Sequence, residues 1–169
     1  MKKIFLSILI CSIIGVISYS FTEKPKKKFS KVSLENKMIA LDNSEITFQE
    51  ILKKHKGKTI VIDVWASWCS DCVGGMPKVK ALQNENPDIV YLFLSMDKSF
   101  DKWKMGIEKY DVKGEHYWVT DGMKGVFGKS IDLDWIPRYM VVDKKGKIAL
   151  YKAIEADDEK ISDILKNPK

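Results

Sequence analysis

The sequence predicts an α/β domain whose central mixed sheet is covered by helices on both faces. Two continuous apolar runs, residues 59–66 and 88–97, have the β-branched pattern of strands buried on both faces. A helical segment separates them, which is typical of a parallel βαβ unit with a right-handed crossover. A hairpin at residues 138–152 then adds antiparallel strands, with its turn at 143–146.

Two short elements are expected before the first buried strand. Residues 32–41 favour a short strand or hairpin. Ser44, with Thr47 three residues later, forms a modest capping-box pattern. Apolar residues at 48, 51 and 52 then favour a short helix.

Helical spacing follows each buried strand. A helix is expected from Cys69 to about Asn86, and another over residues 98–110. Further along the chain, residues 115–120 favour a short strand and residues 122–131 a weak helix. The chain closes with a helix in residues 155–167, whose acidic first turn suits the helix dipole.

The N-terminus has the features of a targeting segment. Two lysines precede an apolar run from Ile4 to about Ile17, which is the length of a signal-peptide core. We expect residues 1–20 to be a signal peptide or a membrane anchor, residues 21–31 a flexible lysine-rich linker, and residues 32–169 the folded domain. Cys11 is interpreted as one more apolar residue of the leader.

The charge distribution argues against nucleic-acid binding. The chain has 29 basic and 23 acidic residues, but residues 1–31 contain seven of the lysines and one acid. Residues 32–169 therefore hold 22 of each and are neutral. A nucleic-acid interface would need its basic excess on the folded domain.

The stretch "DVWASWCSDC" places Cys69 and Cys72 between a buried strand and a helix. Unpaired N–H groups and the dipole at a helix N-terminus stabilise a thiolate on Cys69, and Cys72, one turn later, is placed to close a disulfide. One thiol of such a pair attacks a substrate disulfide and the other resolves the mixed intermediate.

A metal site and a purely structural disulfide are the alternatives for this pair. A zinc site needs about four ligands, and only His55 and His116 are available to add to the pair, at no recognised spacing. We expect a solvated His55 and a structural His116. A three-residue separation constrains little of the unfolded chain, which argues against a purely structural disulfide.

The segment "VIDVWASWCSDCVGGMP" resembles the thioredoxin superfamily, especially its exported TlpA/ResA-like branch. The resemblance covers roughly residues 32–169. Asp63 matches the buried aspartate of thioredoxins, and Pro77 matches the proline of the active-site helix. "WIPRYMVVD" matches the segment with a cis-proline, which implies a cis Ile136–Pro137 bond.

The resemblance implies a role for each site residue. Cys69 would be the attacking thiol and Cys72 the resolving one, while Asp63 would be a desolvated carboxyl with a raised pKa that transfers a proton to or from Cys72. The remaining implied residues bind substrate or tune the redox potential: Trp68, Ile136 and Pro137 for binding, and Ser70 and Asp71 for tuning.

The sequence departs from the family pattern at the dipeptide between the cysteines and at Gly75. Ser70-Asp71 stands where thioredoxin has Gly-Pro, and a carboxylate at 71 disfavours a neighbouring thiolate, which favours a more reducing couple. Gly75 stands where the exported branch often has a glutamate. Asp63 is the residue expected to take over its proton role.

The sequence thus predicts a thioredoxin fold with an N-terminal extension strand or hairpin, in an exported or membrane-tethered thiol–disulfide oxidoreductase. We expect a periplasmic or otherwise extracytoplasmic reductant; a cytoplasm-facing anchor is the less favoured location. Its expected partners are protein thiols or disulfides and an unidentified redox donor or acceptor. No cofactor, metal or nucleic acid is expected, and the protein is expected to be a monomer. The alternative is a non-catalytic thioredoxin-fold module that holds a partner or a metal through the Cys pair.

Overall fold

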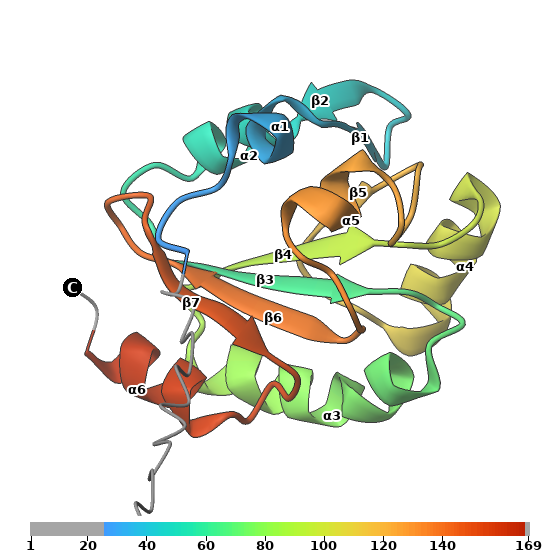
Figure 1. The fold of residues 1–169 in the computed structure, drawn as a ribbon. Helices are drawn as coiled ribbons and strands as arrows, with labels where there is room; N and C mark the ends of the chain where they lie inside the picture. Colours follow the sequence, from blue (N-terminus) through green and yellow to red (C-terminus); the bar gives the residue numbers. More distant parts are fainter. Residues whose placement is uncertain (1–25, 168–169) are drawn as a thin grey trace, which may run out of the picture.

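A computed structural model describes residues 26–167, which form one seven-stranded mixed sheet with helices on both faces (Figure 1). The strand order is β2-β1-β5-β4-β3-β6-β7. The strands are β1 (Lys37–Ala40), β2 (Glu45–Thr47), β3 (Ile60–Trp65), β4 (Val90–Ser95), β5 (Glu115–Trp118), β6 (Arg138–Val142) and β7 (Ile148–Ala153). The helices are α1 (Lys31–Glu35), α2 (Phe48–Lys54), α3 (Ser70–Glu85), α4 (Phe100–Tyr110), α5 (Val126–Ser130) and α6 (Glu159–Lys166).

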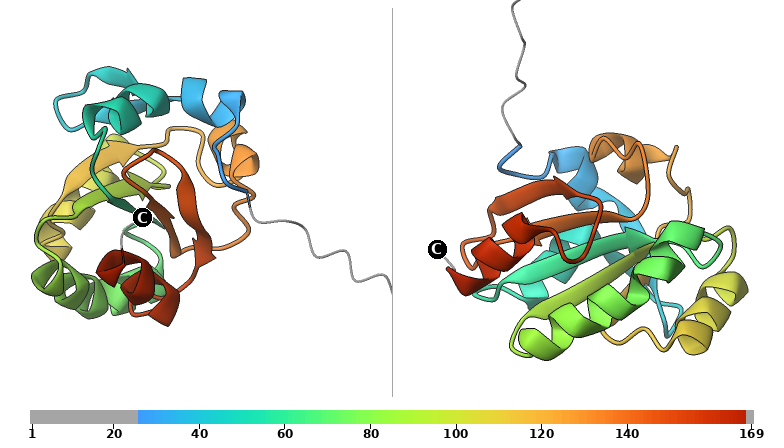
Figure 2. Two further views of the ribbon diagram at one scale, coloured as in Figure 1. Left: turned by 90° about the vertical axis from the view of Figure 1, so that its left-hand side faces the viewer. Right: turned by 90° about the horizontal axis from the view of Figure 1, so that it is seen from below.

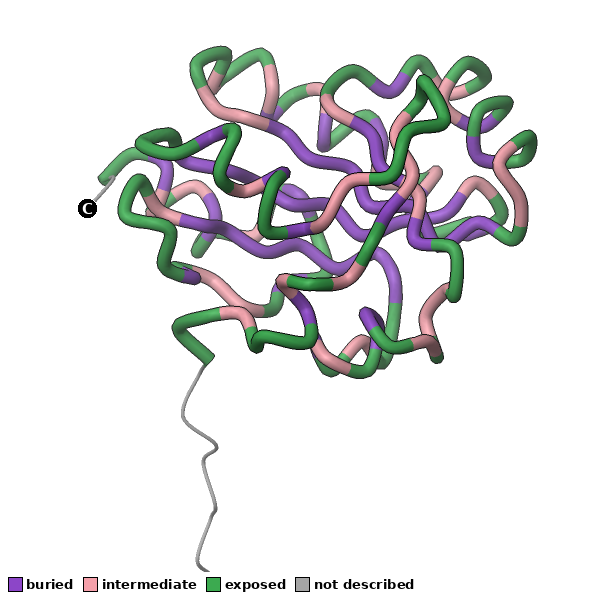
Figure 3. Tube along the Cα trace, turned by 90° about the horizontal axis from the view of Figure 1, so that it is seen from above, coloured by how far each residue is buried: buried purple, intermediate pink, exposed green. Residues whose placement is uncertain are grey.

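Strand β3 is an interior strand of the sheet, between β4 and β6, and is buried along its whole length. It pairs in parallel with β4 and antiparallel with β6, so the predicted βαβ unit and the later hairpin meet on its two sides. Figure 3 shows this pattern as buried chain through the central strands and exposed chain around the rim. The fold predicted from the sequence, a mixed sheet with flanking helices, is therefore confirmed.

The N-terminal extension is a hairpin of β1 and β2, whose first strand also pairs antiparallel with β5. Two details differ from the sequence prediction. Residues 32–35, expected in a strand or hairpin, belong to the helix α1. The capping box of α2 uses Thr47 and Glu50, whereas Ser44 lies in the hairpin turn. Thr47 is favoured as the cap because a carboxylate three residues later reaches back to its backbone N–H.

Residues 26–30, the described end of the predicted linker, pack against the domain. The Phe29 ring lies edge-on to that of Phe48, with ring centroids 4.9 Å apart. The backbone N–H of Ile148 donates a hydrogen bond to the carbonyl of Lys27 at 3.0 Å. The expected leader, Cys11 included, lies outside the described residues, and none of the described helices has the length and apolar character needed to cross a bilayer.

Helices α3 and α6 cover one face of the sheet, and α1, α2 and α5 cover the other (Figures 1 and 2). Helix α3 begins at Ser70, one residue after the predicted start, with Cys69 as its N-cap. Pro77 lies inside this helix and removes one backbone hydrogen bond from its ladder. The helix nevertheless continues to Glu85, because its buried residues anchor it to the sheet; these are Cys72, Met76, Val79 and Leu82.

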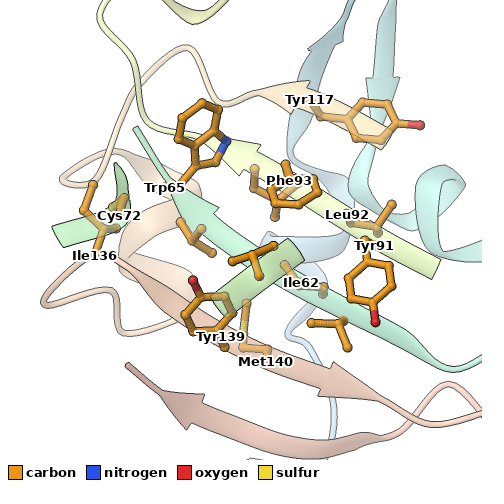
Figure 4. Packing of buried hydrophobic residues seen from close by; sticks show 14 of the residues in the cluster. Ile62, Trp65, Cys72, Tyr91, Leu92, Phe93, Tyr117, Ile136, Tyr139 and Met140 are labelled. Carbon is orange, nitrogen blue, oxygen red and sulfur yellow. The ribbon is translucent and has the colours of Figure 1, made fainter. Parts of the chain in front are cut away.

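The core between α3 and the sheet connects the fold to the Cys pair. Figure 4 shows Cys72 and Ile136 at one end of the buried cluster, with Trp65 and Tyr139 nearby. The apolar packing that stabilises the domain therefore extends directly to Cys72.

Two helical glycines should respond oppositely to alanine substitution. A Cβ at Gly74 in α3 would meet nothing within 4 Å, so Gly74→Ala should raise the free energy of unfolding by about 0.5–1 kcal/mol through helix propensity. A Cβ at Gly106 in α4 would lie 2.4 Å from the Cβ of Ser67, so Gly106→Ala should lower it by about 1–3 kcal/mol. Urea unfolding of the oxidised proteins measures both values; equal effects of the two substitutions would contradict this packing.

Candidate active site

Cys69 and Cys72 are joined by a disulfide, with their Cα atoms 5.3 Å apart. The Cys69 sulfur also caps α3, because the backbone N–H of Cys72 donates a hydrogen bond to it at 3.1 Å. Cys69 is 7% exposed and Cys72 is 1% exposed. The two sulfurs therefore differ in access, and Cys69 is the one that an outside thiol or disulfide reaches first.

The Ile136–Pro137 peptide bond is cis, which is the geometry that the family resemblance implies. Its Ile136 carbonyl oxygen lies 3.6 Å from the Cys69 sulfur. Sheet pairing produces this closeness, because β6 begins directly after Pro137 and lies beside β3, which leads to Cys69. Residues 67 positions apart in the chain thus form one site.

A shallow apolar groove of about 220 Å³ opens beside Cys69. Trp68 and Trp135 border it and are 54% and 60% exposed. Its described lining residues are Trp68, Cys69, Ser70, Asp71, Met123, Trp135 and Ile136. Of these residues, Met123 and Trp135 were not predicted from the sequence. The position of Trp135 immediately before the Ile136–Pro137 pair was the only signal for it.

Asp63 is buried in the middle of β3, at 3% exposure, and neither carboxyl oxygen has a hydrogen-bond partner among the described residues. Desolvation raises the pKa of this carboxyl to about 7. The hydroxyl of Tyr139, which faces the carboxyl without a well-formed hydrogen bond, partly opposes the rise in that pKa. A carboxyl with this pKa exchanges protons near neutral pH.

The loop before Cys69 is fixed by a buried carboxylate that the sequence analysis missed. Asp97 accepts hydrogen bonds from the Ser67 backbone N–H at 3.0 Å and from the Ser67 hydroxyl at 2.7 Å. It also accepts one from the Ser95 hydroxyl at 2.8 Å. An acidic residue two positions after a buried strand end was the available signal, and these bonds hold the turn that presents Trp68.

The loop before Pro137 is fixed by Arg138, which was also missed and is almost fully buried. Its guanidinium donates to the backbone carbonyls of Ile131 at 3.4 Å and Asp132 at 3.3 Å, and it pairs with the Asp134 carboxylate. A single side chain therefore ties three positions of the loop together on the side away from Tyr139.

Ser70 and Asp71 are exposed in the first turn of α3. His116 is structural: its ring stacks on Phe93, and burial lowers its pKa to about 4, so it is neutral at pH 7. The prediction of a solvated His55 is wrong, because this side chain is buried, with its Nε2 atom 3.1 Å from a Glu115 oxygen. The described residues contain no group of three or more His, Cys, Asp or Glu arranged to hold a metal ion.

The family profile described as thioredoxin-like matches residues 57–148, which include Asp63, the Cys69–Cys72 pair and Pro137. Thiol-disulfide oxidoreductase ResA of Bacillus thuringiensis subsp. konkukian is 23% identical over 97% of this chain and 93% of its own length. Thioredoxin-like protein YneN of Bacillus subtilis is 26% identical over 88% of each chain.

Solved structures agree with these sequence relatives. A solution structure from Bacteroides vulgatus, described as a candidate thiol-disulfide oxidoreductase, is 29% identical, with a TM-score of 0.64 over 77% of this chain and 83% of that one. A thiol:disulfide interchange protein from Bacteroides sp. is 22% identical, with a TM-score of 0.65 over 83% and 88% of the two chains, and shows the same fold.

The buried Asp63 carboxyl should make stability depend on pH. Its pKa of about 7 in the folded protein exceeds the ordinary value of 3.8, so the folded state binds the extra proton. Stability from this group is therefore present below pH 4 and lost as the pH rises toward 7, at up to about 1.4 kcal/mol per pH unit. Asp63→Asn should remove this loss and be the more stable protein at pH 8. Urea unfolding of both oxidised proteins at pH 5 and pH 8 tests it; parallel changes in the two proteins would contradict it.

Proposed function

The chain belongs to the thioredoxin-like family, and from this premise we propose that it is a thiol–disulfide oxidoreductase acting on protein cysteines as a reductant outside the cytoplasm. One observation carries the proposal. The Cys69–Cys72 disulfide lies at the N-terminus of α3, with Cys69 accessible beside the cis Ile136–Pro137 bond. In this arrangement a partner can contact the Cys69 sulfur, while the Cys72 sulfur is buried behind it.

The proposed reaction proceeds in two exchanges. In the reduced protein, the Cys69 thiolate attacks a sulfur of the substrate disulfide, forms a mixed disulfide and releases one substrate thiolate. The Cys72 thiol gives its proton to the Asp63 carboxylate and attacks the Cys69 sulfur, which releases the second substrate thiolate. The substrate gains two electrons, and the Cys69–Cys72 pair is oxidised.

The loop at Ile136 would hold the substrate chain. The Ile136 carbonyl beside the Cys69 sulfur gives an extended substrate backbone a hydrogen-bond acceptor next to the reacting atom. Trp68, Ile136 and Pro137 would bind the side chains that flank the substrate cysteine. Ser70 and Asp71 would tune the potential from the first turn of α3.

Three features support export and a reducing direction. Residues 1–20 have the composition of a signal peptide or anchor, although they lie outside the described residues. The family resemblance is to an exported branch, and the full-length relatives include ResA proteins. Asp71 places a negative charge beside the pair, which disfavours the thiolate and favours electron donation. We propose a signal peptide or anchor at 1–20, followed by a short linker and the folded domain.

Reduction of insulin disulfides by the dithiothreitol-reduced protein tests the proposed activity. We expect turnover by the wild type and none by Cys69→Ser, which lacks the attacking sulfur. Cys72→Ser should retain the first exchange and trap the mixed disulfide.

A wild type without reductase or oxidase activity under any redox poise would overturn the enzyme proposal. Stoichiometric zinc or copper in the purified protein would favour the binding module instead. A potential near thioredoxin's, about −270 mV, supports a reductant.

Removing the Asp71 charge should make the couple more oxidising. Without that charge the Cys69 thiolate is more stable in Asp71→Asn, so the reduction potential should become less negative by about 5–20 mV, a small change because the carboxylate is exposed. Equilibration with glutathione measures it. Asp101→Asn is the matched control, since Asp101 is also the second residue of its helix, α4, and should leave the potential unchanged. A more negative potential in Asp71→Asn would contradict the tuning role.

A further inference from the structure

The buried carboxyl of Asp63 has one polar side chain opposite it. Asp63 on β3 pairs directly with Tyr139 on β6 in antiparallel register, so their side chains project from the same face of the sheet. Tyr139 is 2% exposed, and its hydroxyl faces Asp63. Neither carboxyl oxygen has a hydrogen-bond partner among the described residues.

The same hydroxyl lies against the helix that carries Cys72. A Cβ built at Gly75 would be 3.8 Å from the Tyr139 hydroxyl. Gly75 is three residues after Cys72, so the two share one face of α3. In Figure 4 the Tyr139 hydroxyl is directed toward the half of the core that holds Cys72 and Ile136. Tyr139 therefore stands where the sheet, α3 and the resolving cysteine meet.

Tyr139 also borders a solvent-open pocket of about 310 Å³, which shares Asp71 and Trp135 with the groove beside Cys69. Gly74 and Gly75 form part of its wall, and neither has a side chain that could separate the Tyr139 hydroxyl from the pocket. Asp63 is not among the described residues that line this pocket. Of Asp63 and Tyr139, only Tyr139 lines the pocket.

We propose that Tyr139 is a positioning residue whose hydroxyl connects the Asp63 carboxyl to solvent through this pocket. After Asp63 takes the proton of the Cys72 thiol, it donates that proton to the Tyr139 oxygen while the Tyr139 O–H donates its own to water in the pocket. One proton leaves, Asp63 returns to the carboxylate, and Tyr139 is neutral before and after. This inference rests on the proposed thiol–disulfide exchange.

The charged groups around the pocket allow this assignment. Asp71 and Lys78 line it from α3, and Glu155 lines it from the segment after β7. Lys78 pairs with Glu155 and with Asp157, at 3.1 Å for the latter, so its charge is balanced locally. Burial and the neighbouring carboxylates raise the pKa of Tyr139, which keeps its hydroxyl protonated throughout the working pH range.

Tyr139→Phe tests the connection, because it removes the hydroxyl and keeps the ring. Carbon-13 NMR of the labelled Asp63 carboxyl in the oxidised protein gives its titration midpoint without requiring activity. We expect the midpoint to rise by about half a pH unit or more, since the carboxylate loses its facing donor. On the acid side of the pH–rate profile for insulin reduction, the midpoint should shift to higher pH by the same amount. A shift of half a pH unit lowers the rate at pH 6 about threefold.

Tyr91→Phe is the matched control. Tyr91 is also buried, and its hydroxyl donates to the Leu82 and Asn86 carbonyls, outside the pocket beside Tyr139. It should leave the Asp63 midpoint unchanged. An unchanged midpoint in Tyr139→Phe, or an equal rise in Tyr91→Phe, would overturn the inference. Inactivity of the wild type on insulin would instead count against the proposed function, with the NMR titration still deciding the role of Tyr139.

A second variant tests the solvent side of the same path. Gly75→Leu keeps Tyr139 and places a side chain between its hydroxyl and the pocket. We expect the Asp63 midpoint to rise here too, because solvent is excluded from the hydroxyl that faces the carboxyl. Gly74→Leu, on the same pocket wall but without a contact within 4 Å at its Cβ, should raise it less. Equal midpoints in the Gly75→Leu and wild-type proteins would overturn the inference even if Tyr139→Phe did not fold.

Discussion

The site depends on a single bonding arrangement at the start of α3. The Cys69 sulfur accepts the backbone N–H of Cys72 and is covalently joined to the Cys72 sulfur. The Cys69 sulfur is thus both the N-cap of α3 and an atom of the disulfide. Because the capping sulfur is also the accessible one, the orientation of α3 determines how a partner meets the disulfide, and every contact that positions α3 contributes to the chemistry.

The pairing of β3 with β6 supplies the remaining parts of the site. At one end it places the Ile136 carbonyl beside the Cys69 sulfur. Near that end it sets Tyr139 opposite Asp63, on the face covered by α3. An antiparallel register fixes both relations together, since slipping it by one residue would move Tyr139 to the opposite face. In the proposed function, substrate binding and proton transfer would therefore both depend on this one strand pair.

Two buried charged side chains fix the two loops of the site, which lie outside the hydrogen-bonded strands. Asp97 accepts hydrogen bonds from the backbone N–H and the hydroxyl of Ser67, in the loop before the Cys pair. Arg138 donates hydrogen bonds to backbone carbonyls of the loop before Pro137. Buried charges are expensive unless paired, so each constrains its loop strongly. Sequence reasoning missed both because an isolated aspartate or arginine near a strand end has the same local pattern as an exposed one. His55 was placed in solvent for the same reason, since a lysine-rich surrounding does not reveal the Glu115 that it meets.

The sequence by itself determined the strand–helix order, the buried run of β3 and the Cys69–Cys72 pair at a helix start, because apolar periodicity and residue spacing are local properties of the chain. It also indicated Asp63 and the cis bond, through resemblance to a known family. Only the tertiary structure decided that Tyr139 faces Asp63 and that Trp135 borders the groove beside Cys69. These relations depend on strand register and on helix placement across the sheet, which are set by packing between segments far apart in the chain.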